Sequence, residues 1–208
     1  MQLTGQAAPP LRFVRTLGGM PGMRHLVLHD DHGRAYPEGR SRERTFPDAG
    51  GHYVSDAVVP RLPADVHTVQ LDIPFVTVSE TGEATVQVPL TGTQVGDHIP
   101  LNATLTLGTD TLQIPYAEII DQRGERRLLL HLAAGDWRDG RKLVGPEQIA
   151  VNGNGVAFQS GGAGDVYQTT QVSIALPAVG AAALSITLKS PAVAIAGPWH
   201  LKAPVPVH

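Results

Sequence analysis

The chain has 208 residues, a formal net charge of −3 at pH 7 and no cysteine. This length fits one or two domains that can each bury a core, and the lack of cysteine excludes disulfides and thiolate metal sites. The small charge, without a basic patch, argues against nucleic acid as a partner. With 23 glycines, 17 prolines and 5% aromatic residues, the composition favours many strands and turns.

The first half of the chain predicts short strands separated by turns. In order, we expect a loose lead-in at residues 1–10, strands at 11–17, 24–29 and 34–36, an exposed arginine-rich loop at 37–51 and a strand at 53–59. Residues 68–78 follow, where Val69, Leu71 and Ile73 alternate with polar residues. This period of two is typical of a half-buried strand. Pro74 then implies an edge position or a bulge, because proline cannot donate a ladder hydrogen bond.

The middle of the chain continues the same pattern. A turn at residues 80–83 and a strand at 84–90 close a first module, and residues 91–97 form a short linker. The second module has expected strands at 98–107, 111–120, 126–133, 148–151, 155–159 and 166–175, with a long loop at 134–146. Residues 116–132 also fit a helix, because Glu, Arg and Leu favour helices, but Gly124 in the middle favours strands.

The last stretch, residues 176–206, repeats a pattern found about one domain earlier. Leu176-Pro177 and Ala178 match Leu62-Pro63 and Ala64. The further matches are Val69 with Leu184, Leu71 with Ile186, Ile73 with Leu188, Gly82 with Gly197, Val86 with Leu201, Val88 with Ala203 and Pro89 with Pro204. The similarity could arise by chance between two β-hairpins with alternating apolar residues, or from a duplication. The recurrence of Leu-Pro-Ala, Gly and Pro in the same order favours a duplication.

We therefore expect an all-β chain of two tandem Ig-like antiparallel β-sandwich domains, each closed by its own final hairpin. The predicted domains are residues 1–92 and 93–208. The first has fewer expected strands, so that it either lacks its leading strands or borrows an edge from its neighbour.

A family resemblance rests on the same C-terminal residues. The strand at 184–188, followed by Gly197-Pro198-Trp199 and a closing strand that ends at Pro206, resembles the end of Ig-like extracytoplasmic domains in bacterial membrane-anchored, anti-sigma-factor-like proteins. The turn at 31–36 is similar to one in the same domains, whose function is unknown. The resemblance implies a non-catalytic sensing, spacing or protein-interaction module, with a protein or cell-envelope component as partner. It brings no catalytic residue and no cofactor.

Such proteins carry a sigma-binding segment and a membrane helix before these domains, and neither occurs in this sequence. No stretch reaches the length of about 20 apolar residues that spans a bilayer, and no export signal is present. An extracytoplasmic or cell-surface location is therefore expected if the chain belongs to a longer membrane-anchored protein. The sequence does not indicate an oligomeric state.

The first candidate site is the run of residues 29–32, with His25 nearby. Its two imidazoles and two carboxylates are donor types that suit zinc. Neighbouring residues of a strand face opposite sides, however, so that four adjacent side chains cannot easily reach one ion. We therefore favour a solvated turn and keep His29 and Asp31 as a weak candidate metal pair.

The second candidate is the long loop, where Asp136, Trp137 and Asp139 lie close in sequence and Glu147 follows. A tryptophan flanked by carboxylates suits a carbohydrate or calcium site, which makes a carbohydrate-binding or carbohydrate-active protein the alternative function. Trp137 fits better as a plug at one end of a sandwich, and Trp199 fits the core. No phosphate-binding loop and no Gly-x-Ser-x-Gly elbow occur, so we do not expect an enzyme.

Overall fold

The computed structural model describes residues 2–6, 12–15, 27–37, 40–44, 52–58, 61–176 and 181–205. In these residues the chain forms antiparallel strands and no α-helix, which confirms the all-β prediction. Nothing in this part of the chain is a helix able to cross a membrane.

The described residues contain 17 strands. In chain order they are β1 (Gln2–Gln6), β2 (Arg12–Arg15), β3 (Val27–Asp30), β4 (Ala35–Pro37), β5 (Arg40–Arg44), β6 (His52–Val58), β7 (Thr68–Ser79), β8 (Glu83–Pro89), β9 (His98–Leu107), β10 (Asp110–Gln122), β11 (Glu125–His131), β12 (Ala133–Ala134), β13 (Arg141–Val151), β14 (Asn154–Val156), β15 (Phe158–Ala163), β16 (Gln168–Ala175) and β17 (Ala183–Pro204).

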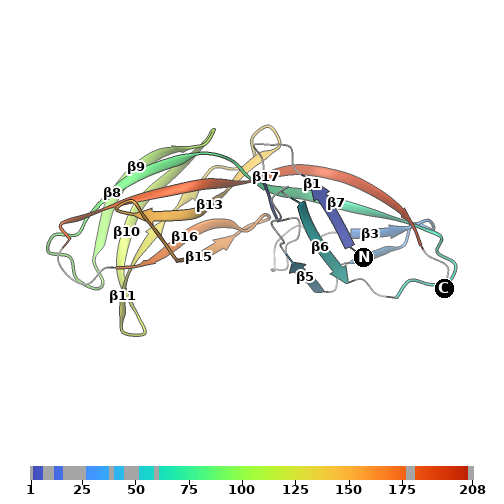
Figure 1. Ribbon diagram of the computed structural model, residues 1–208, viewed down its shortest axis with the longest axis horizontal. Helices are drawn as coiled ribbons and strands as arrows, with labels where there is room; N and C mark the ends of the chain where they lie inside the picture. The colour runs from blue at the N-terminus through green and yellow to red at the C-terminus, as the bar shows by residue number, and fades with distance from the viewer. Residues whose placement is uncertain are drawn as a thin grey trace.

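The strands form an elongated molecule of two lobes (Figure 1). An eight-stranded sheet of order β14-β13-β17-β7-β3-β4, with β8 paired to β17 and β2 paired to β7, extends through both lobes. In the larger lobe it is covered by a six-stranded sheet that contains β9 to β12, β15 and β16. The smaller lobe holds a three-stranded sheet of order β1-β6-β5. The packing of two sheets in the larger lobe is that of a β-sandwich.

Alternating apolar residues build the cores of the lobes. The larger core collects inward side chains of both sheets, namely Val86, Val88, Leu112, Ile114, Ile119, Leu128, Leu130, Val172, Ile174, Leu184, Ile186 and Leu188 among others. The smaller core contains Val69, Leu71 and Ile73, the three residues whose alternation predicted a half-buried strand. Leu62 and Trp199 pack against this smaller core, and Leu176 packs against the larger one. Pro177 lies outside the described residues.

One long ribbon connects the two cores. Strand β17 has 22 residues and pairs with β8 through its first half and with β7 through its second half. Leu184 lies opposite Val88, whereas Leu201 lies opposite Leu71. The two final hairpins that the sequence predicts therefore do not form. Each predicted closing strand pairs instead with the strand that belongs to the other half of the repeat.

The repeated sequence and the strand pairing obey the same two-fold relation. Val69 pairs with Ala203, and their sequence counterparts Leu184 and Val88 also pair. The same holds for Leu71 with Leu201 and for Ile186 with Val86. The shift that relates these positions also relates Val78 to Val193, and those two valines pair with each other. An approximate two-fold axis thus passes through this pair, and the two lobes exchange their closing strands across it.

Local geometry keeps the ribbon continuous at the junction of the lobes. The amide of Glu80 donates to the carbonyl of Pro191 at 2.9 Å, and the amide of Ser190 donates to the carbonyl of Gly82 at 2.9 Å. A Cβ on Gly82 would lie 2.6 Å from the amide nitrogen of Gly108, so the chain crosses between lobes where only glycine fits.

The bulge predicted at Pro74 is also present. The register between β7 and β17 shifts between Ala196 and Trp199, opposite the segment that contains Pro74. A Cβ on Gly197 would collide with the carbonyl oxygen of Ile73, so a glycine is required at the bulge. Gly197 and Pro198 thus serve the local geometry of β17, and Trp199 resumes the pairing opposite Ile73.

Several segments differ from the sequence prediction. Strand β1 occupies the expected lead-in, β5 lies in the expected loop at 37–51, and β13 begins inside the expected loop at 134–146. Residues 91–97 join β8 to β9 within the larger lobe, where Gly96 donates to the carbonyl of Ile119 at 2.7 Å, so they do not link two modules. Strand pairing recruited these polar segments through backbone hydrogen bonds, which do not require apolar alternation. The helix considered for 116–132 is the β10–β11 hairpin.

The exchange can be tested with a cross-strand disulfide. The hydroxyl oxygens of Thr85 and Thr187, which lie opposite each other in β8 and β17, are 3.0 Å apart on the surface. Directly opposed residues of antiparallel strands have the Cα separation that a disulfide needs. We expect the T85C/T187C double variant to oxidise in air to a cross-linked monomer, detected as loss of free thiol and faster migration on a non-reducing gel.

The control is the T85C/T77C variant, which joins β8 to β7 as the predicted hairpin would. The native chain contributes no cysteine, so each readout reports one pair. Rapid cross-linking of T85C/T77C with free thiols in T85C/T187C would contradict the exchange.

Candidate functional site

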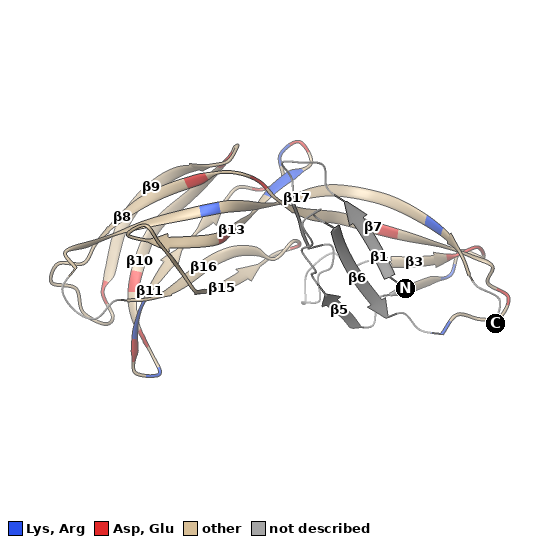
Figure 2. Ribbon diagram, viewed as in Figure 1, with Lys and Arg blue, Asp and Glu red and all other residues tan. Residues whose placement is uncertain are grey.

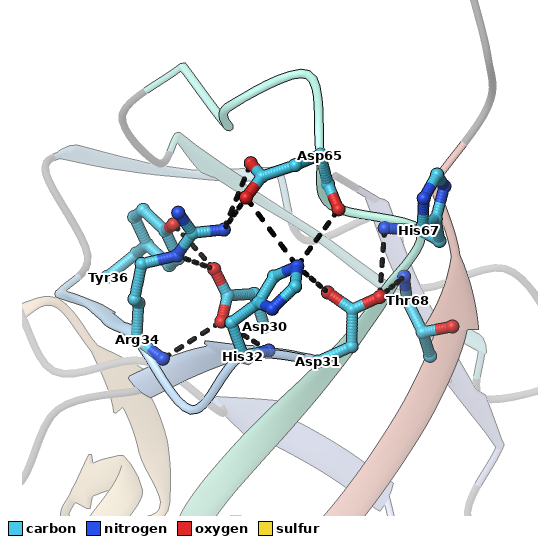
Figure 3. Close-up of polar contacts among 8 residues, drawn as sticks. All are labelled: Asp30, Asp31, His32, Arg34, Tyr36, Asp65, His67 and Thr68. Atoms are coloured by element: carbon cyan, nitrogen blue, oxygen red, sulfur yellow. Dashed lines mark hydrogen bonds and ion pairs between the residues drawn. The ribbon is translucent and has the colours of Figure 1, made fainter.

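A polar cluster at the tip of the smaller lobe contains much of the sequence candidate at residues 29–32 (Figure 3). The turn between β3 and β4 brings its backbone amides round Asp30, whose side chain is fully buried. The Asp30 carboxylate accepts hydrogen bonds from the amides of His32 (2.9 Å) and Arg34 (2.8 Å) and from the Tyr36 hydroxyl (2.7 Å). The Arg34 Nε also donates to it, at 2.5 Å. The buried charge is thus fully paired, as a stable interior requires.

These contacts set the protonation of the cluster. Burial raises the pKa of the Asp30 carboxyl, but the hydrogen bonds from Tyr36, Arg34 and His32 outweigh burial and hold that pKa far below its usual range. Hydrogen bonds to Asp30 and Asp65 raise the pKa of the Arg34 guanidinium, and the bond to Asp30 raises the pKa of Tyr36. The hydrogen bond from Arg34 lowers the pKa of Asp65. The cluster is therefore a fixed ion-pair network.

The neighbouring residues of the turn fasten the loop at residues 61–67 to β3. Asp31 accepts from the amides of His67 (3.1 Å) and Thr68 (3.3 Å). The His32 Nε2 lies 3.1 Å from the carbonyl oxygen of Asp65, and Arg34 donates to the Asp65 carboxylate at 3.1 Å (Figure 3). At the other end of this loop, the Pro63 carbonyl accepts from the amide of Val66 at 3.2 Å. The tip is thus a cross-braced turn.

The candidate metal pair is not brought together. His29 points to the outer face of the sheet, where its Nε2 lies 3.3 Å from a carboxylate oxygen of Asp72. Asp31 is engaged with the amides of the loop, and His25 lies outside the described residues. Across the part of the chain that is described, no three histidine, aspartate or glutamate side chains are placed to hold a metal ion.

Each lobe instead carries one carboxylate between two imidazoles on adjacent strands. In the smaller lobe, Asp72 lies between His29 and His200, whose Nδ1 is 2.5 Å from the second carboxylate oxygen. The hydrogen bond with His200 lowers the pKa of Asp72.

In the larger lobe, Glu118 lies 2.7 Å from His98 Nε2 and 3.4 Å from His131 Nε2, with Tyr116 stacked between the two rings. His98 and His200 are exposed, and contacts of such surface side chains contribute about 0–1 kcal/mol each, so they brace the strands only weakly.

The second candidate, Trp137, lies where the lobes meet. Its ring is half-buried against a small cluster formed by Phe75, Val166 and Ala194, and its Nε1 donates to Asp165 at 2.8 Å. Phe75 comes from β7 and Ala194 from β17, so this cluster seals the junction.

The carboxylates near Trp137 do not converge on it as a group. Asp136 and Asp139 are both exposed, and Asp139 occupies a tight turn with φ of 50°. Asp136, Trp137 and Asp110 line a hollow of about 240 Å³, whereas Asp139 does not. Glu147 lies on β13 beside a different groove. The expected carboxylate cluster therefore reduces to Asp136 beside the indole.

Two polar arrangements were not foreseen from the sequence. Arg141 donates to both carboxylate oxygens of Glu80, at 2.7 and 3.0 Å, and to Asp110 at 3.0 Å. Lys142, which is almost buried, lies 3.3 Å from Asp165. Both arrangements join residues far apart in sequence. The sequence shows only that Arg141 and Lys142 follow Gly140, and this pattern does not identify their acidic partners.

Comparisons of the chain with models of protein families, with curated protein sequences and with solved structures gave no match.

The Asp30 network predicts a defined response to acid. Because the folded-state pKa of Asp30 lies below its unfolded value of about 3.9, its stabilisation is present above that value and is lost as the pH falls towards the folded pKa. The Asp30 carboxylate accepts four hydrogen bonds. In the Asp30→Asn variant the side-chain NH2 group replaces one carboxylate oxygen, so that its N–H donors face the donors of the neighbouring residues. We expect a clearly lower melting temperature at pH 7 and a difference from wild type that shrinks between about pH 4 and pH 2.

The exposed Asp136→Asn variant is the matched control and should melt like wild type across this range. A constant difference between wild type and Asp30→Asn at all pH values would show that the Asp30 carboxylate does not titrate as the network requires.

Proposed function

We propose that the chain is a non-catalytic extracytoplasmic module, made of two Ig-like β-sandwich lobes, that senses, spaces or binds a protein or cell-envelope partner. It would act as do the outer domains of the anti-sigma-factor-like proteins that its C-terminal residues resemble. The observation that carries the proposal is the shared ribbon. Because β17 lies in both lobes, the surfaces of one lobe are held at a set distance and orientation from those of the other.

The packing at the junction supports this rigidity. Phe75 is only 1% exposed although it belongs to neither the larger nor the smaller core. Arg141 on β13 bridges Glu80, at the crossing from β7 to β8, and Asp110 at the start of β10. The hydrogen bonds with Glu80 and Asp110 raise the pKa of the Arg141 guanidinium, so this bridge stays charged at any physiological pH. A spacing element needs such a braced junction, whereas a hinge would need few buried contacts.

Rigidity can be measured with spin labels in the intact chain. Thr104 on β9 and Lys202 on β17 are exposed, and they lie in the larger and the smaller lobe respectively. We expect a T104C/K202C variant, doubly labelled, to give a single narrow distance distribution by electron–electron double resonance. The native chain has no cysteine, so both labels are placed without further substitutions. A broad or two-peaked distribution would contradict the proposed spacing function.

A second candidate function rests on the hollow beside Trp137. Its lining of indole, Asp110 and Asp136 suits a sugar, as in the carbohydrate-binding alternative derived from the sequence. Gly135 borders this hollow, and a Cβ built there meets nothing within 4 Å. A phenylalanine at this position is therefore expected to obstruct the hollow while Trp137 keeps its packing.

Affinity electrophoresis in soluble polysaccharides separates the two functions. The proposed interaction module predicts equal mobility of the wild type and of Gly135→Phe in every gel. Retardation of the wild type that Gly135→Phe and Asp136→Ala both abolish would favour the carbohydrate-binding function instead.

A further inference from the structure

The larger lobe has one open side, where the chain leaves one sheet for the other. Strand β14 pairs with β13 only from Ile149 to Val151 and ends at Val156. After Ala157 the chain joins the opposite sheet as β15, which pairs with β16. In the described part of the chain, Arg141 also pairs with Arg138, and the carbonyl of Leu143 accepts a hydrogen bond from Gln168. Residues 144–148 of β13 therefore have β17 as their only strand partner. An unpaired strand edge of this kind can accept a further strand.

A groove of about 540 Å³ lies at this open side. The half-buried side chains of Val156 and Phe158 provide its apolar surface, while Ile149 is only 2% exposed, and Gly155 leaves room along one wall. The groove is thus bordered by a β-strand edge and by pockets for alternate side chains, which are the two features that bind an extended peptide by strand addition.

One uncompensated charge lies in the groove. Lys189 lines it but its Nζ is 3.3 Å from Glu83, so that this pair is neutral. Glu147 also lines it, and its side chain has neither a hydrogen bond nor an ion pair with any residue that the structure describes. Strand β15, on the other side of the opening, contains no charged residue (Figure 2). The groove therefore favours a cationic side chain.

We propose that this groove binds an extended peptide segment of a partner protein, in which an apolar side chain is followed closely by a lysine or arginine. The segment adds to the edge of β13 in line with β14, its apolar side chain packs against Val156 and Phe158, and its cation meets Glu147. A second copy of the chain is a poorer occupant, because a two-fold contact would place one acidic groove against another. This assignment rests on the proposed protein-interaction function and names the site and the chemistry of the partner.

The probes are two short synthetic peptides of alternating valine and threonine, labelled with fluorescein, one with a central lysine and the other with glutamate in its place. Binding to the full chain is followed by fluorescence anisotropy. We expect the lysine peptide to bind more tightly than the glutamate peptide by roughly two- to fivefold, with a preference that weakens as salt is added. Glu147→Lys should reverse this preference.

Gly155→Phe adds a ring beside the groove without backbone strain, because a Cβ built at Gly155 meets nothing within 4 Å and the residue is not in the left-handed region. We expect this variant to melt like wild type and to bind the lysine peptide at least roughly tenfold more weakly. Gly135→Phe, which obstructs the hollow beside Trp137, is the matched control and should bind like wild type.

Three results would overturn the proposal. The first is that the wild type binds both peptides equally or binds neither. The second is that Gly135→Phe loses binding and Gly155→Phe does not. The third is a concentration-dependent dimer that Gly155→Phe abolishes, which would assign the groove to a second copy. Should Gly155→Phe fail to fold, an unchanged preference in Glu147→Lys overturns it equally. A narrow label distance with no peptide binding would reject this groove alone and leave the spacing function intact.

Discussion

The continuous antiparallel ribbon formed by β17 with β7 and β8 is the constraint on which the rest of the structure depends. It places Leu184, Ile186 and Leu188 in the larger core and Trp199 against the smaller one, so that a single strand contributes to both. The collapse of apolar surface in one lobe therefore helps to align the edge on which the other lobe is built. The glycines at 82 and 197 allow the close backbone approaches that keep this ribbon unbroken. The shared strand thus joins the two lobes through one continuous sheet.

The sequence predicted the strands of this ribbon but not their partners, and the reason is physical. The alternation of Val69, Leu71 and Ile73 reports that one face is buried, and this is equally true whether the strand pairs with β8 or with β17. The two-fold relation between the repeats makes the closed hairpin and the exchanged strand indistinguishable by pattern. Strands β1 and β5 were missed because their residues alternate poorly, so that pairing rather than periodicity reveals them.

The candidate sites show the same limit of sequence reasoning. His29 and Asp31 are close in sequence, which suggested a shared role. In the structure His29 contacts Asp72 on the outer face of the sheet, whereas Asp31, in the turn, accepts from the amides of His67 and Thr68. Trp137, which the sequence favours as a plug at one end of a sandwich, packs against Phe75 and Val166 where the lobes meet. Glu147 was weighed as a member of a carboxylate cluster, yet its isolation is what makes it a candidate for binding.

The exchanged ribbon also sets the order in which the molecule can be completed during synthesis. The smaller lobe is built mainly from strands up to β7, but its closing strand, opposite Val69 and Leu71, follows β8 to β16 in the sequence. Until the ribosome has released residues 199–204, the edge of β7 has no β17 to pair with, and its apolar face is open to water or to a chaperone. The larger lobe also depends on β17, because the first half of that strand lies between β8 and β13 and supplies Leu184, Ile186 and Leu188 to the larger core. Neither lobe can therefore complete its sheet until β17 has been synthesised, so one late strand finishes both.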